Sequence, residues 1–165
     1  MPLNEVFIAE LENEAKATRR LLERVPIEKS DWQPHGKSMT MGRLASHVAE
    51  ISGWVAHTLD ADELDFSKMD YKPKIAKSNA ELLEIFEENH KKALNSLKNA
   101  KDEEFMKPWT LRNGEHVYMT LPKAVVLRSF AYSHQIHHRG QLTVYMRMND
   151  VPLPGIYGPT ADEQM

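Results

Sequence analysis

The sequence contains no cysteine, and this absence limits the chemistry that the chain can carry out. Disulfide bonds, cysteine-ligated zinc and a thiol nucleophile belonging to the protein are all excluded. A chain without disulfides suits a reducing compartment, and we therefore expect a cytoplasmic protein.

Long apolar runs and an excess of basic residues are missing as well. No segment approaches the ~18 consecutive apolar residues that a membrane-spanning helix requires. The N-terminal stretch MPLNEVFIAELENEAK carries acidic residues where a signal peptide has positive charge and then an unbroken apolar run. The formal net charge of -3 lacks the basic excess that nucleic acid binding usually leaves. We therefore expect neither a membrane nor nucleic acid as a partner.

The sequence does contain four segments in which apolar residues recur every three or four positions, the spacing of an amphipathic helix. They run from 4 to 25, from 40 to about 59, from 79 to 100 and from 121 to about 148. Pro26 ends the first segment, because proline cannot continue a helix. Thr40 is suited to cap the second segment, and Ser78 or Asn79 opens the third. Pro122 lies in the first turn of the fourth, where its missing N–H loses no hydrogen bond.

A different pattern separates the third and fourth segments. The dipeptide Asn113-Gly114 lies between two short runs, WTL and HVYM. Asn-Gly favours a type I′ turn, since both central residues of that turn need positive φ. We predict one domain over 1–165, all-α in class, in which a four-helix bundle carries a small β-hairpin before the last helix. The long second and third connections leave the order of the helices open.

Three of the eight histidines lie in SHQIHHRGQL, residues 133–142, within the last predicted helix. At about 100° per residue, His134 and His138 lie one turn apart in the middle of the predicted core-facing stripe, and His137 lies at its edge. His47 lies on the inward face of the second predicted helix. Three neutral imidazoles inside an apolar bundle are costly to desolvate without partners, and one divalent ion removes that cost. From the residues alone, a metal site competes with surface histidines and hydrogen-bonded core histidines.

We expect ordinary roles for the remaining histidines and for the arginine of this segment. His35 and His116 fall in a loop and in the hairpin, and His57 lies off the inward stripe. His90 follows polar residues and is expected on a solvated face. Arg139 is expected to point outward and to form a structural ion pair or to dock the C-terminal tail.

Three short motifs resemble those of a known family, the DinB/YfiT-like superfamily. LASHVAE matches its histidine in the second helix, HQIHHRGQL its H-x-x-x-H-R-G-Q motif in the fourth, and VPLPGIYGP its Pro-rich tail. The resemblance spans essentially the whole chain. It implies a bundle with up-down-down-up connectivity, often a homodimer. It also implies a divalent metal, usually zinc or nickel, held by His47, His134 and His138, with His137 as a neighbour that does not bind it. Some members are thiol-S-transferases that use bacillithiol, mycothiol or glutathione.

Three histidine ligands leave a coordination position open, which is the pattern of a catalytic metal site. Lowering the pKa of a bound water leads to a hydrolase, and lowering that of a thiol leads to a thiol transferase. Glu50 is a candidate general base or hydrogen-bond partner of a histidine, Gln141 a candidate to orient a ligand, and Tyr157 a candidate to cap the site or pack the tail. The leading expectation is a metal-dependent thiol-S-transferase that acts on a small-molecule substrate with a low-molecular-weight thiol. The alternatives are a metal-dependent hydrolase and a non-catalytic stress protein that binds small molecules.

Overall fold

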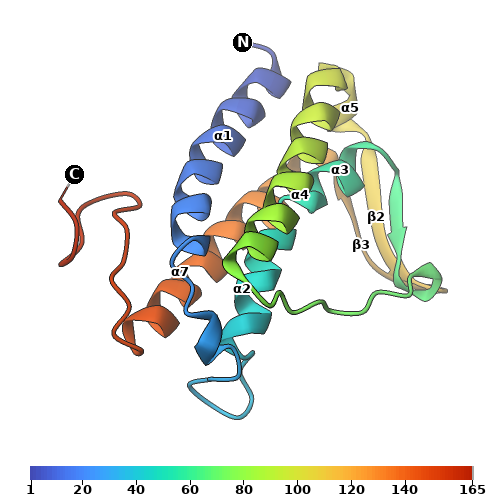
Figure 1. Cartoon of the computed structure of the whole chain (residues 1–165). Helices are drawn as coiled ribbons and strands as arrows, with labels where there is room; N and C mark the ends of the chain where they lie inside the picture. Colours follow the sequence, from blue (N-terminus) through green and yellow to red (C-terminus); the bar gives the residue numbers. More distant parts are fainter. Residues whose placement is uncertain (165) are drawn as a thin grey trace.

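The structure, a computed structural model, describes residues 1–164 and is mostly helical, with a small sheet on one side (Figure 1). The longer helices are α1 (Leu3–Leu22), α2 (Met41–Glu50), α3 (Gly53–Leu59), α4 (Asn79–Asn99) and α7 (His134–Arg147). The shorter helical segments are η1 (Ile27–Lys29), η2 (Phe66–Lys68), α5 (Asp102–Met106), α6 (Lys123–Val126) and the π-helix η3 (Leu127–Ser133). The strands are β1 (Glu63–Asp65), β2 (Pro108–Asn113) and β3 (His116–Pro122). Helix α4 contacts α1, α2 and α3, and α7 contacts α1 and α2, so these helices surround the main core.

Two of the long helices begin at the capping residues that the sequence predicts. The Thr40 side-chain oxygen accepts a hydrogen bond from the backbone N–H of Arg43 at 3.3 Å, at the start of α2. The Ser78 side-chain oxygen accepts one from the backbone N–H of Glu81 at 3.1 Å, at the start of α4. Each bond satisfies a backbone donor that the first helical turn leaves without a partner. Among residues 1–164, no helix has both the length and the apolar character needed to cross a membrane.

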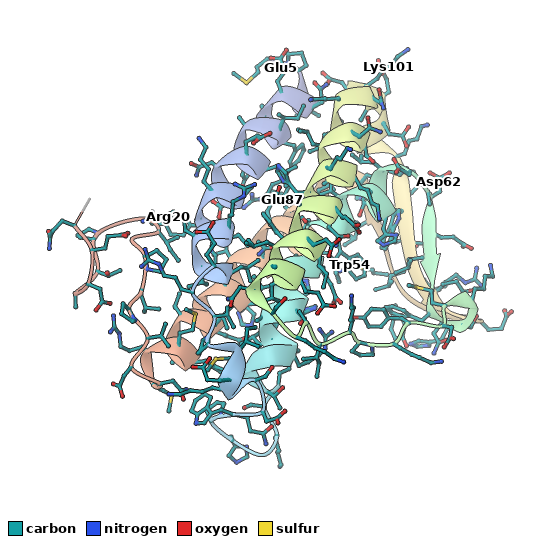
Figure 2. All side chains as sticks on the ribbon, in the orientation of Figure 1. Glu5, Arg20, Trp54, Asp62, Glu87 and Lys101 are labelled. Carbon is teal, nitrogen blue, oxygen red and sulfur yellow. The ribbon has the colours of Figure 1, made fainter. Side chains whose placement is uncertain are left out.

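Side chains from α1 connect this helix to α4 and to the C-terminal tail (Figure 2). Arg19 of α1 donates to both carboxylate oxygens of Glu87 on α4, at 2.5 and 3.1 Å. Arg20 points toward the tail and donates to the Gly155 carbonyl at 2.8 Å. These contacts are exposed, so they orient the surfaces that meet and add little to stability.

The predicted second helix is divided, and a continuous helix from Thr40 to Leu59 is therefore wrong. Helix α2 ends at Glu50, and α3 begins at Gly53 after two residues of turn. At this point α4 passes very close, because a Cβ atom added to Gly53 would lie 2.5 Å from the Asn89 side-chain oxygen. The helical spacing of apolar residues continues across the break, so the periodic pattern does not reveal it.

The predicted hairpin is present, but it belongs to a larger sheet. Strands β2 and β3 pair antiparallel around the predicted turn, where Gly114 has a φ of 58°. Strand β1 adds to β2 in parallel, and the strand order is β1-β2-β3. The Asp65 carboxylate secures this junction by accepting from the backbone N–H of Gly114 at 2.9 Å and from the Ser67 hydroxyl at 2.7 Å. Sequence analysis missed β1 because this three-residue strand lies in an acidic run without alternation.

The last predicted helix starts slightly later than expected and changes its winding. Pro122 ends β3, and the helical chain begins at Lys123 as α6, continues through η3 and becomes α7. The mostly helical class is confirmed, and the small sheet extends the predicted hairpin. The four-helix bundle with up-down-down-up connectivity stays a prediction, because the second and fourth predicted helices are each composed of several elements.

Candidate metal centre

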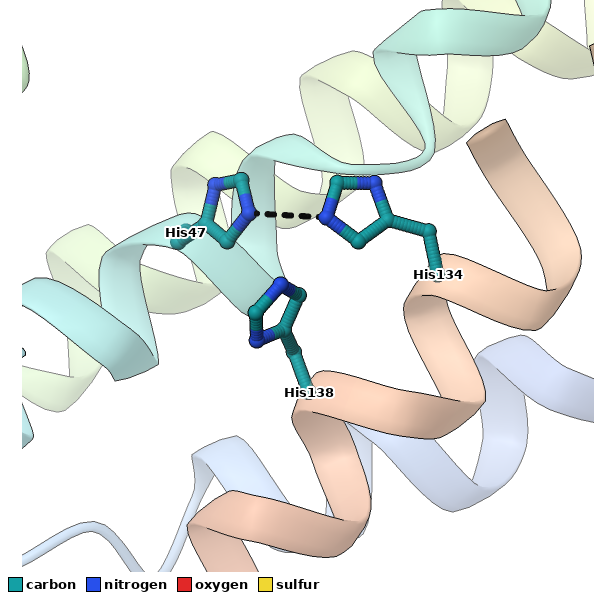
Figure 3. Close-up of side chains that lie close together, drawn as sticks. All are labelled: His47, His134 and His138. Atoms are coloured by element: carbon teal, nitrogen blue, oxygen red, sulfur yellow. Dashed lines mark hydrogen bonds between the residues drawn. The ribbon is translucent and has the colours of Figure 1, made fainter. Parts of the chain in front are cut away.

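Helices α2 and α7 bring three histidine side chains together (Figure 3). His47 comes from α2, and His134 and His138 come from successive turns of α7. One ring nitrogen from each residue lies within 4.8 Å of those of the other two, and the Nε2 atoms of His47 and His134 are 3.2 Å apart. All three side chains are partly buried. The convergence of these residues agrees with the expectation from the sequence, while the binding of a metal by them stays a prediction.

The π-helix η3 sets the direction in which His134 and His138 point. A π turn takes more residues than an α turn, and π segments recur at functional sites. The buried stripe therefore passes in steps of four residues from Ala131 to Gln135 and Arg139. The two histidines lie beside this stripe and face α2. The prediction that they occupy its middle is wrong, because that prediction assumed regular α-helical winding through residues 127–133.

Two of the three histidine rings have an acceptor within hydrogen-bond distance of Nδ1, and the third has a carboxylate farther away. Nδ1 of His134 lies 3.3 Å from the Phe130 carbonyl oxygen, and Nδ1 of His138 lies 2.7 Å from the Gln141 side-chain oxygen. Nδ1 of His47 lies 4.0 Å from Glu50 Oε2. A neutral ring that donates its Nδ1 proton outward keeps the lone pair of Nε2 free for a metal. The expected outer acceptors are thus present for His134 and His138, while Glu50 lies beyond hydrogen-bond distance of His47.

The protonation states of the rings also suit a metal ion. Burial, together with the neighbouring His138, His134 and Arg43, lowers the pKa of His47 to about 4. Burial also lowers the pKa of His134 and of His138. The rings are therefore mainly neutral at pH 7, the form in which imidazole binds metals. Three neutral nitrogen donors fit zinc, nickel, copper or iron in the divalent state.

Glu50 lies at the edge of the site and is already engaged by other side chains. Its Oε2 atom accepts from the Tyr71 hydroxyl at 2.9 Å and from Arg43 Nη1 at 3.4 Å. The same oxygen is the one that faces Nδ1 of His47, on the outer side of that ring. This position favours a role in orienting His47 over a role as general base.

Tyr157 and Arg139 lie on a different side of α7, where they join the tail to α1. Arg139 is almost fully buried, with 1% of its surface exposed, and donates to the Glu14 carboxylate and to the Tyr157 hydroxyl. The Tyr157 hydroxyl also donates to the Glu14 carboxylate at 2.6 Å. The outward direction predicted for Arg139 is therefore wrong, while its ion pair and its contact with the tail are confirmed. Tyr157 packs the tail and does not cap the histidine cluster.

Two further histidines, His137 and His90, lie outside the cluster, and only one of them is solvent-exposed. His137 is exposed beside the cluster, with its ring centroid 4.8 Å from that of His138. His90 was expected on a solvated face, yet only 8% of it is exposed and its ring stacks on Phe86 at 5.8 Å. That expectation is wrong because α1 packs against α4 on this face and brings Glu12 to 3.8 Å from His90. The four-residue interval from Phe86 to His90 was the signal that sequence analysis overlooked.

A cavity of about 300 Å³ lies beside His47 and was not identified from the sequence. Arg43 and Tyr71 line it together with Glu50, and the Tyr71 hydroxyl accepts from Arg43 Nη2 at 2.9 Å. Tyr71 belongs to an irregular segment without periodic spacing, so no sequence signal placed it near α2. The cavity gives the histidine cluster a neighbouring space in which a small molecule can bind.

The contact between Gln141 and His138 leads to a prediction about metal affinity. Replacing Gln141 with leucine is expected to weaken divalent metal binding about 10- to 100-fold, because His138 loses the acceptor that holds its ring. Gln141→Glu is the matched control and should keep most of the affinity, since a carboxylate accepts the same hydrogen bond. Competition with a colorimetric metal indicator measures both constants. Equal affinity of Gln141→Leu and the wild type would show that this hydrogen bond does not hold the ring.

Comparisons with known proteins agree with the fold and with the motifs. The family model described as "DinB family" matches residues 1–164. The uncharacterized protein YrdA of Bacillus subtilis (strain 168) is 27% identical over 157 residues, which cover 95% of this chain and 89% of YrdA. A DinB-like protein from Bacillus cereus ATCC 10987 has a similar structure, with a TM-score of 0.71, 20% identity, and coverage of 93% of this chain and 97% of that one. The DinB-like protein YjoA of Bacillus subtilis gives a TM-score of 0.69 at 18% identity, with 96% and 99% covered. The chain therefore belongs to the DinB family.

Proposed function

We propose that the protein binds one divalent metal ion, zinc or nickel, through His47, His134 and His138. The observation that carries this proposal is the meeting of three imidazole nitrogens within 4.8 Å of one another. The outward acceptors at Nδ1 of His134 and His138 support it, because they are the partners that metal-binding histidines normally have. The depressed pKa values support it further, since protons then compete weakly for the nitrogens at pH 7.

We further propose that the site is catalytic and that the protein is a metal-dependent thiol-S-transferase. Three protein ligands leave a position open, as in catalytic metal sites. A divalent ion held by His47, His134 and His138 would supply Lewis acidity that lowers the pKa of a nearby thiol and would make the thiolate available at neutral pH. The chain has no cysteine, so the sulfur belongs to a low-molecular-weight thiol that serves as cosubstrate. The resemblance to the family supports the same assignment and a homodimer, and a chain without cysteine suits the cytoplasm.

The residues of the chain have separate tasks in this proposal. Gln141 and the Phe130 carbonyl hold the rings of His138 and His134. The cavity beside His47 receives the second substrate, which carries an electrophilic carbon. In the transfer, the thiol loses its proton, its sulfur bonds to that carbon, and the leaving group departs with the electron pair of the broken bond.

A hydrolase and a non-catalytic binding protein are the alternatives. A hydrolase gains from a general base beside the attacking water. Glu50 is the carboxylate nearest to His47 among the residues that line the cavity, and its contacts with Arg43 and Tyr71 hold it on the outer side of the ring. This geometry makes the transferase the better supported activity. A binding protein would hold the same small molecule without turnover.

A conjugation assay tests the proposed activity. Protein purified without a histidine tag and loaded with zinc or nickel is mixed with bacillithiol, mycothiol or glutathione and a panel of electrophiles. We expect thioether formation that depends on the metal with at least one thiol, and its loss on chelation. Conjugation no faster than in buffer containing the free ion, for every thiol and electrophile, would contradict the transferase. Ester hydrolysis by the same loaded protein would favour the hydrolase.

A further inference from the structure

The cavity beside His47 has walls from segments that are far apart in the sequence. Ile51 and Trp54 lie on the side of α2 and α3, and Asn89 of α4 is also in the lining. Leu64, Phe66 and Met69 contribute from β1, η2 and the segment that follows. Figure 2 shows Trp54 in the region between α4 and the sheet. The volume of about 300 Å³ is at the lower end of the range for small-molecule pockets.

Trp54 forms a fixed aromatic wall of this cavity. Its ring packs against Trp109 at 6.4 Å and against Phe130 at 5.8 Å between centroids. Trp109 is fully buried, so the contacts behind Trp54 hold the indole in place. A wall of this kind presents a flat surface on which another planar group can stack.

The mouth of the cavity carries large apolar side chains that remain uncovered. Phe66 is 41% exposed and Met69 is 38% exposed, although both line the same space as Trp54. Covering these side chains with an apolar ligand is favourable by about 25 cal/mol for each Å² of apolar surface removed from water. The methionine thioether is also suited to contact with an aromatic ring.

The charged groups of the lining neutralise each other. Arg43 and Glu50 form an ion pair at 3.4 Å, and the Tyr71 hydroxyl bonds to both. Apart from the imidazoles of His47 and His57, the other residues of the lining have uncharged side chains. An anionic ligand would have to compete with Glu50 for Arg43, and a cationic one with Arg43 for Glu50. The cavity therefore favours an uncharged ligand.

We propose that this cavity binds the electrophilic substrate, and that the substrate is an uncharged, flat, apolar molecule of the aromatic type. Trp54, Phe66 and Met69 contact its ring, and the cavity shares His47 with the histidine cluster. The binding part of this inference depends only on the cavity. The assignment of the ligand as a substrate rests on the proposed transferase activity.

The test uses 1-chloro-2,4-dinitrobenzene as the neutral probe and 4-chloro-3,5-dinitrobenzoate as its anionic counterpart. In the reaction of either probe with a thiol, a C–S bond forms, the C–Cl bond breaks, chloride leaves with the electron pair, and the thiol proton goes to solvent. Equilibrium dialysis without thiol measures binding alone. Steady-state kinetics of the metal-loaded protein with thiol measures KM and kcat for the probe.

The double variant Phe66→Ala/Met69→Ala removes the exposed part of the wall. We expect the Kd and the KM for the neutral probe to rise about tenfold with kcat little changed, because both side chains contribute apolar contact and do not touch the reacting atoms. Val144→Ala/Met148→Ala is the matched control, since these exposed apolar residues lie on α7 and directly after it, outside the cavity. Both constants should stay at the wild-type values in this control.

Separate outcomes decide the two proposals. If the neutral probe binds the wild type in dialysis and this binding is lost in Phe66→Ala/Met69→Ala, the result supports the cavity as the binding site. This holds even if no thiol is transferred and the transferase proposal fails. Equal Kd values for the wild type and this variant would overturn the cavity assignment, even if transfer occurs. Binding of the anionic probe as tightly as the neutral one would overturn the inference that the ligand is uncharged.

Discussion

Replacing His134 with alanine is expected to reduce the bound divalent metal from about one ion per chain to nearly none. The change removes one of three nitrogen donors and leaves His47 and His138 on different helices, too few to hold an ion firmly. Elemental analysis of protein purified without a histidine tag measures the content. Calorimetric titration of the metal-free protein with zinc or nickel measures the affinity.

His137→Ala is the matched control for this experiment. His137 belongs to the same helix, is more exposed than His134, and lies beside His138 without joining the cluster. Its removal should leave both the metal content and the affinity unchanged. A normal metal content in His134→Ala would remove the assignment of the three histidines as ligands. An equal loss in the two variants would point instead to general binding of metal by a histidine-rich surface.

Replacing Arg139 with methionine is expected to lower the free energy of unfolding by about 3–5 kcal/mol. The guanidinium is buried and pairs with Glu14, which is itself only 8% exposed. It also donates at 3.1 Å to the Glu14 carbonyl and to the Thr18 hydroxyl. Methionine fills similar space but leaves a buried carboxylate without its partner, and that loss dominates the effect. Urea denaturation followed by circular dichroism measures the change.

Two further variants separate the buried pair from an ordinary surface pair. Arg147→Met on the same helix breaks the exposed ion pair with Asp162 and should lower the free energy of unfolding far less, because solvent screens this pair. Glu14→Gln combined with Arg139→Met should recover part of the lost stability, because no unpaired charge then remains buried. A loss in Arg139→Met as small as that in Arg147→Met would mean that the pair contributes nothing beyond a surface contact.

The histidines of the candidate centre were predictable because their arrangement is mostly local. An interval of four residues places His134 and His138 on successive turns of whatever helix carries them. His47 needed a second helix to pack alongside, and the amphipathic pattern around it supplied that expectation. The side of α7 that is buried was not predictable. The seven-residue π-helix before α7 rotates the buried side around the helix axis, and the spacing of apolar residues in the sequence does not reveal this rotation.

The residues around the centre were harder to place. Arg139 was assigned to the surface from an α-helical projection, whereas it lies between α7 and α1 with Glu14 as its partner. Tyr157 follows the last helix by ten residues, and its position depends on where the tail folds back onto the helices. A charged or phenolic side chain gives no periodic signal, so its partner across the structure is hidden from sequence inspection.

Composition and short-range spacing were enough to indicate a cysteine-free, mostly helical chain, its capping residues, the Asn113-Gly114 turn and the identity of the three histidines. Caps, turns and helical spacing depend on residues within a few positions of one another, so they can be predicted from the sequence alone. The break before Gly53, the pairing of β1 with β2 and the cavity closed by Tyr71 depend on contacts between distant segments. Such contacts form wherever they bury the most surface and satisfy the most polar groups, and this free energy belongs to the folded molecule as a whole.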